Sequence, residues 1–133
     1  GTVSVSELTV KDICKFRFGY IVSILEVIVA GSPLKKGQSL TVSADLANIA
    51  MTSKDVYLTI VAHDECNVPI GLAADWITVA AEDGLSPEWT ITIPSWAFVG
   101  TGTLYGNVYT APPSSGGTPM CPEESAVFII LRT

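Results

Sequence analysis

Charged residues are scarce in this chain. Of its 133 residues, 15% are Asp, Glu, Lys or Arg, whereas a typical soluble domain has roughly 25%. Seven basic residues against 13 acidic ones give a formal net charge of −6. Surfaces that bind nucleic acid need clustered positive charge to neutralise phosphates, and here only Lys35 and Lys36 adjoin. The composition therefore excludes nucleic acid as a partner.

Long apolar segments and helical periodicity are also missing. The longest apolar run covers residues 18–30 and is interrupted by Ser23 and Glu26. It is shorter than the roughly 20 residues that a membrane-spanning helix needs, so we expect no membrane span and assign the run to a strand. No other long stretch repeats its apolar positions at the helical period. The chain is therefore predicted to be all-β.

Groups for catalysis are few. The single histidine, His63, lies in the sequence VAHDEC, where strand alternation points it outward. A pair with Cys66 lacks a third group to orient it, and a zinc site needs three or four committed ligands. We expect an ordinary exposed histidine, no catalytic residue, no metal and no cofactor. The chain is not expected to be an enzyme.

Acidic residues in two turns make a calcium site an alternative interpretation. They would form a calcium site if their loops met in space, and otherwise they are solvated turn acids, which we favour. The four residues are Asp64, Glu65, Glu82 and Asp83.

Cysteine is limited to three positions. Cys66 closes a turn, and Cys121 closes a long loop before the last predicted strand. We predict a disulfide between them, because it would pin that loop and restrict the unfolded chain. Two separate thiols are the alternative. Cys14 is then left over, either as a small core residue or as an intermolecular link, and we favour the former.

Strand patterns fill the rest of the chain, separated by turns rich in Gly, Pro, Asn and Asp. Leu40, Val42, Ala44 and Leu46 alternate with polar residues, and so do Val56, Leu58 and Ile60. Short strands at this spacing predict a β-sandwich. The predicted strands are 21–30, 39–48, 55–64, 70–74, 76–80, 88–93, 103–110 and 125–132.

The first residues are surplus to that sandwich. We divide the chain into an N-terminal extension, residues 1–18, and a sandwich of seven or eight strands, residues 19–133. The opening sequence GTVSVSELTV alternates like an extra strand, with a change of phase that a bulge near Ser6 or Glu7 would reconcile. Its apolar residues are Val3, Val5, Leu8 and Val10. They either pair within their own sheet or act as a donor strand for another copy.

Two segments carry a family resemblance. In SPLKKGQSLTVSADLAN, Pro, a basic residue and Gly precede a Thr/Val strand that ends in Asn, and this resembles the opening strands of the immunoglobulin-like and fibronectin-III-like domains of prokaryotic, archaeal surface proteins. IPSWAFVGTGTLYGNVYT resembles their late aromatic strand. The resemblance covers roughly residues 20–132 and implies an immunoglobulin-like β-sandwich at the cell surface. It specifies a fold far better than a function.

With a strand ahead of the sandwich, the layout is also similar to subunits of archaeal extracellular threads and bundling pili. That similarity implies a homo-polymer built by donor-strand complementation, outside the cell. The chain departs from a heavily glycosylated thread because it has no Asn-x-Ser/Thr sequon. We therefore expect a structural subunit of a surface filament that assembles head-to-tail.

A binding module for glycan or protein ligands is the second hypothesis. Trp96 and the proline-rich loop APPSSGG are its ligand-facing candidates. Exposed, coplanar indoles favour glycan binding, and buried indoles favour a structural role. We expect Trp76, Trp89 and Trp96 to lie in the core, because aromatic residues at strand ends of sandwiches are usually buried.

Overall fold

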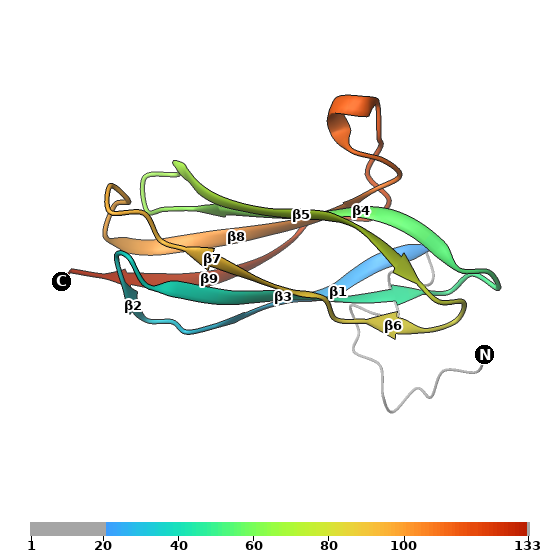
Figure 1. The fold of residues 1–133 in the computed structure, drawn as a ribbon, viewed down its shortest axis with the longest axis horizontal. Coiled ribbons are helices and arrows are strands. Elements are labelled where there is room, and N and C mark those ends of the chain that lie inside the picture. The colour runs from blue at the N-terminus through green and yellow to red at the C-terminus, as the bar shows by residue number, and fades with distance from the viewer. Residues whose placement is uncertain (1–20, 133) are drawn as a thin grey trace.

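The structure is a computed structural model that describes residues 21–132. These residues form two sheets packed as a β-sandwich, as the strand patterns predicted (Figure 1). The elements are β1 (Val22–Ala30), β2 (Leu34–Lys35), β3 (Ser39–Asn48), β4 (Lys54–His63), β5 (Pro69–Val79), β6 (Gly84–Leu85), β7 (Glu88–Thr92), β8 (Gly100–Tyr109), the 3-10 turn η2 (Pro113–Ser115) and β9 (Glu124–Leu131). The predicted donor strand, Cys14 and the boundary at residue 18 lie outside the described residues.

Two sheets enclose the core. One sheet has the order β1-β3, with β6 and β7 both pairing with β3, and the other has the order β2-β9-β8-β4-β5. The inward positions of β3 and β4 that the alternation predicted are confirmed, because each is at most 2% exposed. Phe128 and Ile130 of β9, which lies in the same sheet as β4, are also buried in the core. Within residues 21–132, no helix is long and apolar enough to cross a membrane.

The first two strands of the described chain lie in different sheets, β1 in the four-stranded sheet and β2 in the five-stranded sheet. β1 pairs antiparallel with β3, and the chain then passes through Gly31, at φ +99°, and Pro33. Leu34 and Lys35 of β2 pair in parallel with Ile130 and Leu131. The sequence SPLKKGQ reads as a turn, so this two-residue strand was not predicted.

Asn48, the asparagine at the end of the Thr/Val strand, connects two parts of the fold through its side chain. Its side chain is buried, and its amide nitrogen donates to the carbonyl oxygens of Thr52, Val79 and Ala80 at 3.0–3.2 Å. Its Oδ1 accepts from the backbone N–H of Ala50 at 2.9 Å. One side chain thus ties the turn after β3 to the end of β5 in the opposite sheet.

The prediction of two short strands at 70–74 and 76–80 is wrong. β5 is one continuous strand because β4 pairs with it along its whole length, from Lys54↔Val79 to His63↔Pro69. The polar residue Asp75 does not interrupt it, since an edge strand exposes that side chain to water.

The predicted disulfide is also wrong. The sulfur atoms of Cys66 and Cys121 are not bonded to each other. Cys66 lies in the turn after β4, beside the start of β8, whereas Cys121 follows Met120, whose N–H donates to the carbonyl of Val108 near the end of β8. Seven residues of strand separate those levels, roughly 23 Å. A disulfide allows only about 4.4–6.8 Å between Cα atoms.

Candidate functional site

The outer face of the five-stranded sheet carries aromatic and polar side chains in regular rows. Outward residues of β4 and β8 face each other as the pairs Tyr57↔Tyr109, Thr59↔Asn107 and Val61↔Tyr105. Trp76 of β5 lies opposite Tyr57, and the two rings meet edge to face with centroids 5.7 Å apart. The alternation of β4 and β8 produces this face, because their other residues fill the core.

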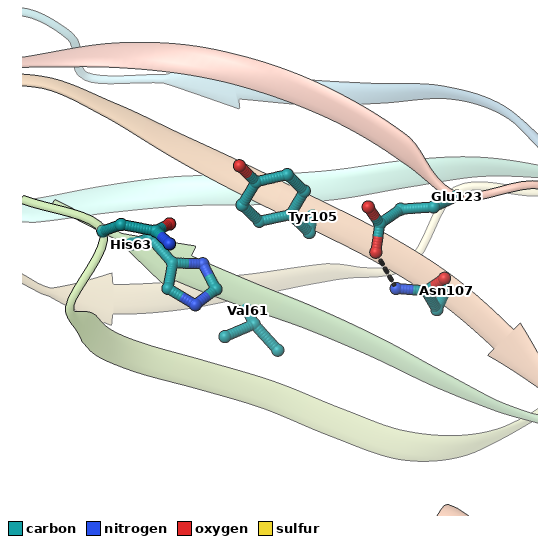
Figure 2. Close-up of a pocket in the computed structure, with 6 residues that line it drawn as sticks. Val61, His63, Tyr105, Asn107 and Glu123 are labelled. Carbon is teal, nitrogen blue, oxygen red and sulfur yellow. Dashed lines mark hydrogen bonds between the residues drawn. The ribbon is translucent and has the colours of Figure 1, made fainter. Parts of the chain in front are cut away.

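A hollow of about 330 Å³ opens on this face (Figure 2). The rings of His63 and Tyr105 form one side of it, with centroids 5.1 Å apart and planes at 72°. Figure 2 shows both rings and Val61 projecting from the same side of the sheet. The hollow is lined by Val61, His63, Asn67, Tyr105, Asn107 and Glu123.

The opposite side of the hollow is polar. The amide nitrogen of Asn107 donates to Oε2 of Glu123 at 2.7 Å. Glu123 is otherwise exposed, at the end of the loop before β9. A hydrogen bond to a carboxylate is stronger than one between neutral groups, so it orients the amide of Asn107. The hollow therefore offers an amide and a carboxylate, hydrogen-bonded to each other, beside an aromatic wall.

His63 contributes an unusual atom to this site. Its side chain points outward, as predicted, but Nδ1 is buried and has no hydrogen-bond partner within the described residues. Leaving a buried polar atom unpaired costs about 1–3 kcal/mol. Such atoms are rare in native structures and call for a functional or structural explanation.

Asp64 anchors the turn beside the hollow. It is 4% exposed, and its Oδ1 accepts from the backbone N–H groups of Cys66 and Val68, both at 3.0 Å. Its Oδ2 accepts from the N–H of Phe98 at 3.1 Å. Burial raises the pKa of this carboxyl, but the three backbone donors and the nearby His63 outweigh it and hold the pKa below the ordinary value of 3.8. Asp64 therefore stays ionised and joins two loops.

The second of those loops carries the predicted ligand-facing residue. Trp96 is 60% exposed and precedes the exposed Phe98 and Val99. Glu65 also holds this loop, because its carboxylate accepts from the backbone N–H of Thr101. Trp96 does not line the hollow, so its role as a ligand contact stays a prediction.

The prediction that the indoles lie in the core is wrong for two of the three. Trp76 is 50% exposed because it occupies an outward position on the edge strand β5. Trp96 is exposed because it lies on a loop at one end of the sandwich. Trp89 is partly buried and packs against the core. Trp76 and Trp96 are on different elements and do not form one platform in the hollow.

The four turn acids do not come together. Asp64 and Glu65 precede β5, whereas Glu82 and Asp83 follow it, so the length of an 11-residue strand separates the two pairs. Among the described residues, no three His, Cys, Asp or Glu side chains are placed to hold a metal ion.

The edge of β9 is a second feature of this sheet. β8 covers one side of β9, but β2 covers only Ile130 and Leu131 on the other. The N–H of Ile129 points to this open side, where Oγ of Ser32 accepts from it at 2.9 Å. By alternation, the N–H and C=O groups of Val127 and Ser125 point the same way. No strand within residues 21–132 pairs with them.

No protein-family model and no curated protein matches the sequence. Among solved structures, the C-terminal domain of Wzt is similar with a TM-score of 0.66 and 14% identity, over 98% of this chain and 90% of that one. A β-glucuronidase from glycoside hydrolase family 2 is similar with a TM-score of 0.60 and 11% identity, over 80% of this chain and 11% of that one. The Pseudomonas fluorescens alkylpurine DNA glycosylase AlkC, bound to DNA containing an abasic site analog, has a TM-score of 0.61 and 13% identity, over 86% of this chain and 32% of that one.

At these identities the similarities show an all-β fold alone. The chain spans about a tenth of the β-glucuronidase and a third of the DNA glycosylase. One sandwich architecture therefore occurs within proteins of unrelated chemistry, and the fold does not decide for or against enzymatic activity.

Proposed function

We propose that this chain is a structural subunit of an extracellular filament, in which a strand from one copy adds to the β9 edge of the next. The open edge of β9 carries the proposal. Natural edge strands are usually protected by charge, proline or a covering segment. β5, the edge strand at the far side of the same sheet, carries Pro69 and Asp75, whereas the part of β9 that β2 leaves uncovered has no proline and one charge, Glu124 at its first residue.

The chemistry of this edge suits an added strand. The N–H and C=O groups of Ser125 and Val127 offer four hydrogen bonds, worth about 0.5–1.5 kcal/mol each. Val127, Ile129 and Leu131 present exposed apolar side chains beside them. A head-to-tail contact of this kind repeats from copy to copy and produces an open filament unless it closes into a ring. The donor in this proposal is residues 2–10, by their alternating sequence.

Val127→Lys tests the acceptor. Val127 is 62% exposed, so the substitution is expected to change the free energy of unfolding by less than about 0.5 kcal/mol. It is also expected to prevent filaments of the full chain in negative-stain electron microscopy, because a charge at the edge opposes strand addition. Leu72→Lys is the matched control, since Leu72 is 64% exposed on the opposite edge strand. Filaments of Val127→Lys, or their loss in both variants, would contradict the proposed acceptor.

The donor is tested separately. A chain without residues 1–12 is expected to stay monomeric and to be stabilised by a synthetic GTVSVSELTV peptide, with Val127→Lys abolishing that effect. If neither the full nor the shortened chain assembles and the shortened one only melts earlier, the opening strand belongs to its own sheet. The filament proposal then fails.

The exposed aromatic loop supports a second candidate function, a binding module. Trp96 is 60% and Phe98 51% exposed, and Asp64 holds their loop in place by accepting from the N–H of Phe98. Exposed apolar patches often mark interaction sites. In this alternative the chain remains monomeric, and Trp96→Ala removes binding of its partner without changing the free energy of unfolding.

A further inference from the structure

We propose that the hollow between β4 and β8 binds a neutral oligosaccharide. This inference is independent of filament assembly, because the hollow lies on the outer face of the sheet and the proposed acceptor is its edge. The site combines an aromatic wall, an oriented amide and a carboxylate (Figure 2). Convergent polar groups beside aromatic rings are the usual composition of a small-molecule site.

The aromatic groups suit the apolar faces of sugar rings. Tyr105 and His63 flank the hollow at one level of the sheet. A second cross-strand row lies at another level of the sheet and consists of Trp76, Tyr57 and Tyr109. The rows of Val61 and Tyr57 are four residues apart along β4, roughly 13 Å. Aromatic surface at both ends of this interval favours a chain of several sugar rings over a single compact ligand.

Between the two aromatic rows, the outward side chains are short, and two of them are polar. Thr59 and Asn107 face each other there, with Ala74 of β5 opposite Thr59. Short side chains leave room above them, and the hydroxyl and amide supply donors and acceptors. A strip with aromatic ends and a polar centre matches the alternation of apolar faces and hydroxyl edges along an oligosaccharide.

Charge indicates that the saccharide is neutral. Glu123 presents a carboxylate to the hollow, and no Lys or Arg is among the residues that line it. The whole chain has a net charge of −6. A carboxylate accepts hydrogen bonds from sugar hydroxyls but repels uronates and phosphates. The site therefore discriminates against acidic sugars.

His63 supplies the independent observation. Its Nδ1 is buried, lacks a partner and belongs to a ring that packs edge to face on Tyr105. An ordinary exposed histidine would turn that nitrogen to water. The strand pairing and Tyr105 hold the ring instead as a wall of the hollow, at the cost of an unpaired nitrogen. An unpaired buried nitrogen in a native structure calls for an explanation, and a ring held in place for a ligand supplies one.

Calorimetric titration of the full chain tests the proposal. The probes are malto-, cello-, manno- and xylohexaose, with a hexagalacturonate and inorganic phosphate as charged probes. We expect at least one neutral probe to bind and both charged probes to bind more weakly. Failure of every neutral probe at millimolar concentration, or tighter binding of a charged probe, would overturn the proposal.

Variants of the polar side locate the binding. Glu123→Gln keeps the shape and removes the charged acceptor, and Asn107→Ala removes its partner. Each is expected to weaken binding of the neutral probe about tenfold or more, as expected for loss of a hydrogen bond to a charged group. Glu88→Gln, an exposed acid on β7 of the other sheet, is the control and leaves the affinity unchanged. Unchanged affinity in Glu123→Gln and Asn107→Ala, or equal loss of affinity in all three variants, would contradict binding in the hollow.

Discussion

Replacing Asp64 by alanine is expected to lower the free energy of unfolding by about 3 kcal/mol. The backbone N–H groups of Cys66, Val68 and Phe98 all lose their acceptor in this variant. They are partly buried, so water replaces the carboxylate incompletely. Because a small domain is stable by only about 5–15 kcal/mol, the loss is a large share of the total. Chemical denaturation measures it directly.

Two further variants isolate the cause. Asp75→Ala is the control, because Asp75 is exposed and accepts from the N–H of its neighbour Trp76; its expected effect is within about 0.5 kcal/mol. Asp64→Asn keeps Oδ1 for Cys66 and Val68 but turns an amide toward the N–H of Phe98. Hydrogen exchange at Phe98 is therefore expected to rise more than exchange at Val68. Equal effects of Asp64→Ala and Asp75→Ala would show that the three bonds carry no stability.

The contribution of Asp64 also depends on pH. Since the folded-state pKa lies below the ordinary value of 3.8, its stabilisation is complete above that value and is lost as the pH falls through the folded-state pKa. The difference in unfolding free energy between the wild type and Asp64→Asn is expected to stay constant above about pH 5 and to shrink below pH 3.8. A difference that grows on acidification would contradict the direction of the shift.

Gly102→Ala is expected to cost about 3 kcal/mol. A Cβ atom at Gly102 would lie 2.3 Å from Cζ of Phe128 and 2.8 Å from the carbonyl oxygen of His63. Phe128 is fully buried, so its ring has little space into which to move. The backbone of His63 must shift as well, because β8 and β4 pair at this level. Thermal and chemical unfolding both measure the cost.

A double-mutant cycle with Phe128→Leu separates the clash from a general effect of alanine in the strand. Leucine removes the ring atoms that Cβ would meet, so Gly102→Ala is expected to cost about 1 kcal/mol less in that background. Some penalty remains from the carbonyl of His63. An equal cost in both backgrounds would mean that the ring contact is not responsible.

The sequence predicted the strands well wherever one face is buried. Alternation placed β3 over its correct residues, 39–48, because one set of side chains must enter the core. It failed for β2, for β6 and for the single length of β5, since all three depend on neighbouring strands rather than on local pattern. The disulfide failed for a related reason, because sequence does not say at which level of the sandwich a turn lies.

The hollow was only partly predictable. The outward direction of His63 followed from alternation, and the same reasoning applied to TLYGNVYT places Tyr105, Asn107 and Tyr109 on the outer face. What the sequence lacks is the register between β4 and β8, which brings His63 beside Tyr105. The contact of Glu123 with Asn107 depends on the path of a long loop. The exposure of Trp76 depended on β5 being an edge strand.

The parallel pairing of β2 with β9 also determines how the sandwich transmits tension. A pull between Ile21 and Arg132 drags β2 toward its N-terminal side and β9 toward its C-terminal side. Parallel strands that are pulled in opposite directions slide along each other, so the hydrogen bonds between β2 and the end of β9 are loaded together instead of opening one after another. The pairing of β1 with β3 carries the same load in the other sheet. We therefore expect the core of the sandwich to resist extension until both pairings break.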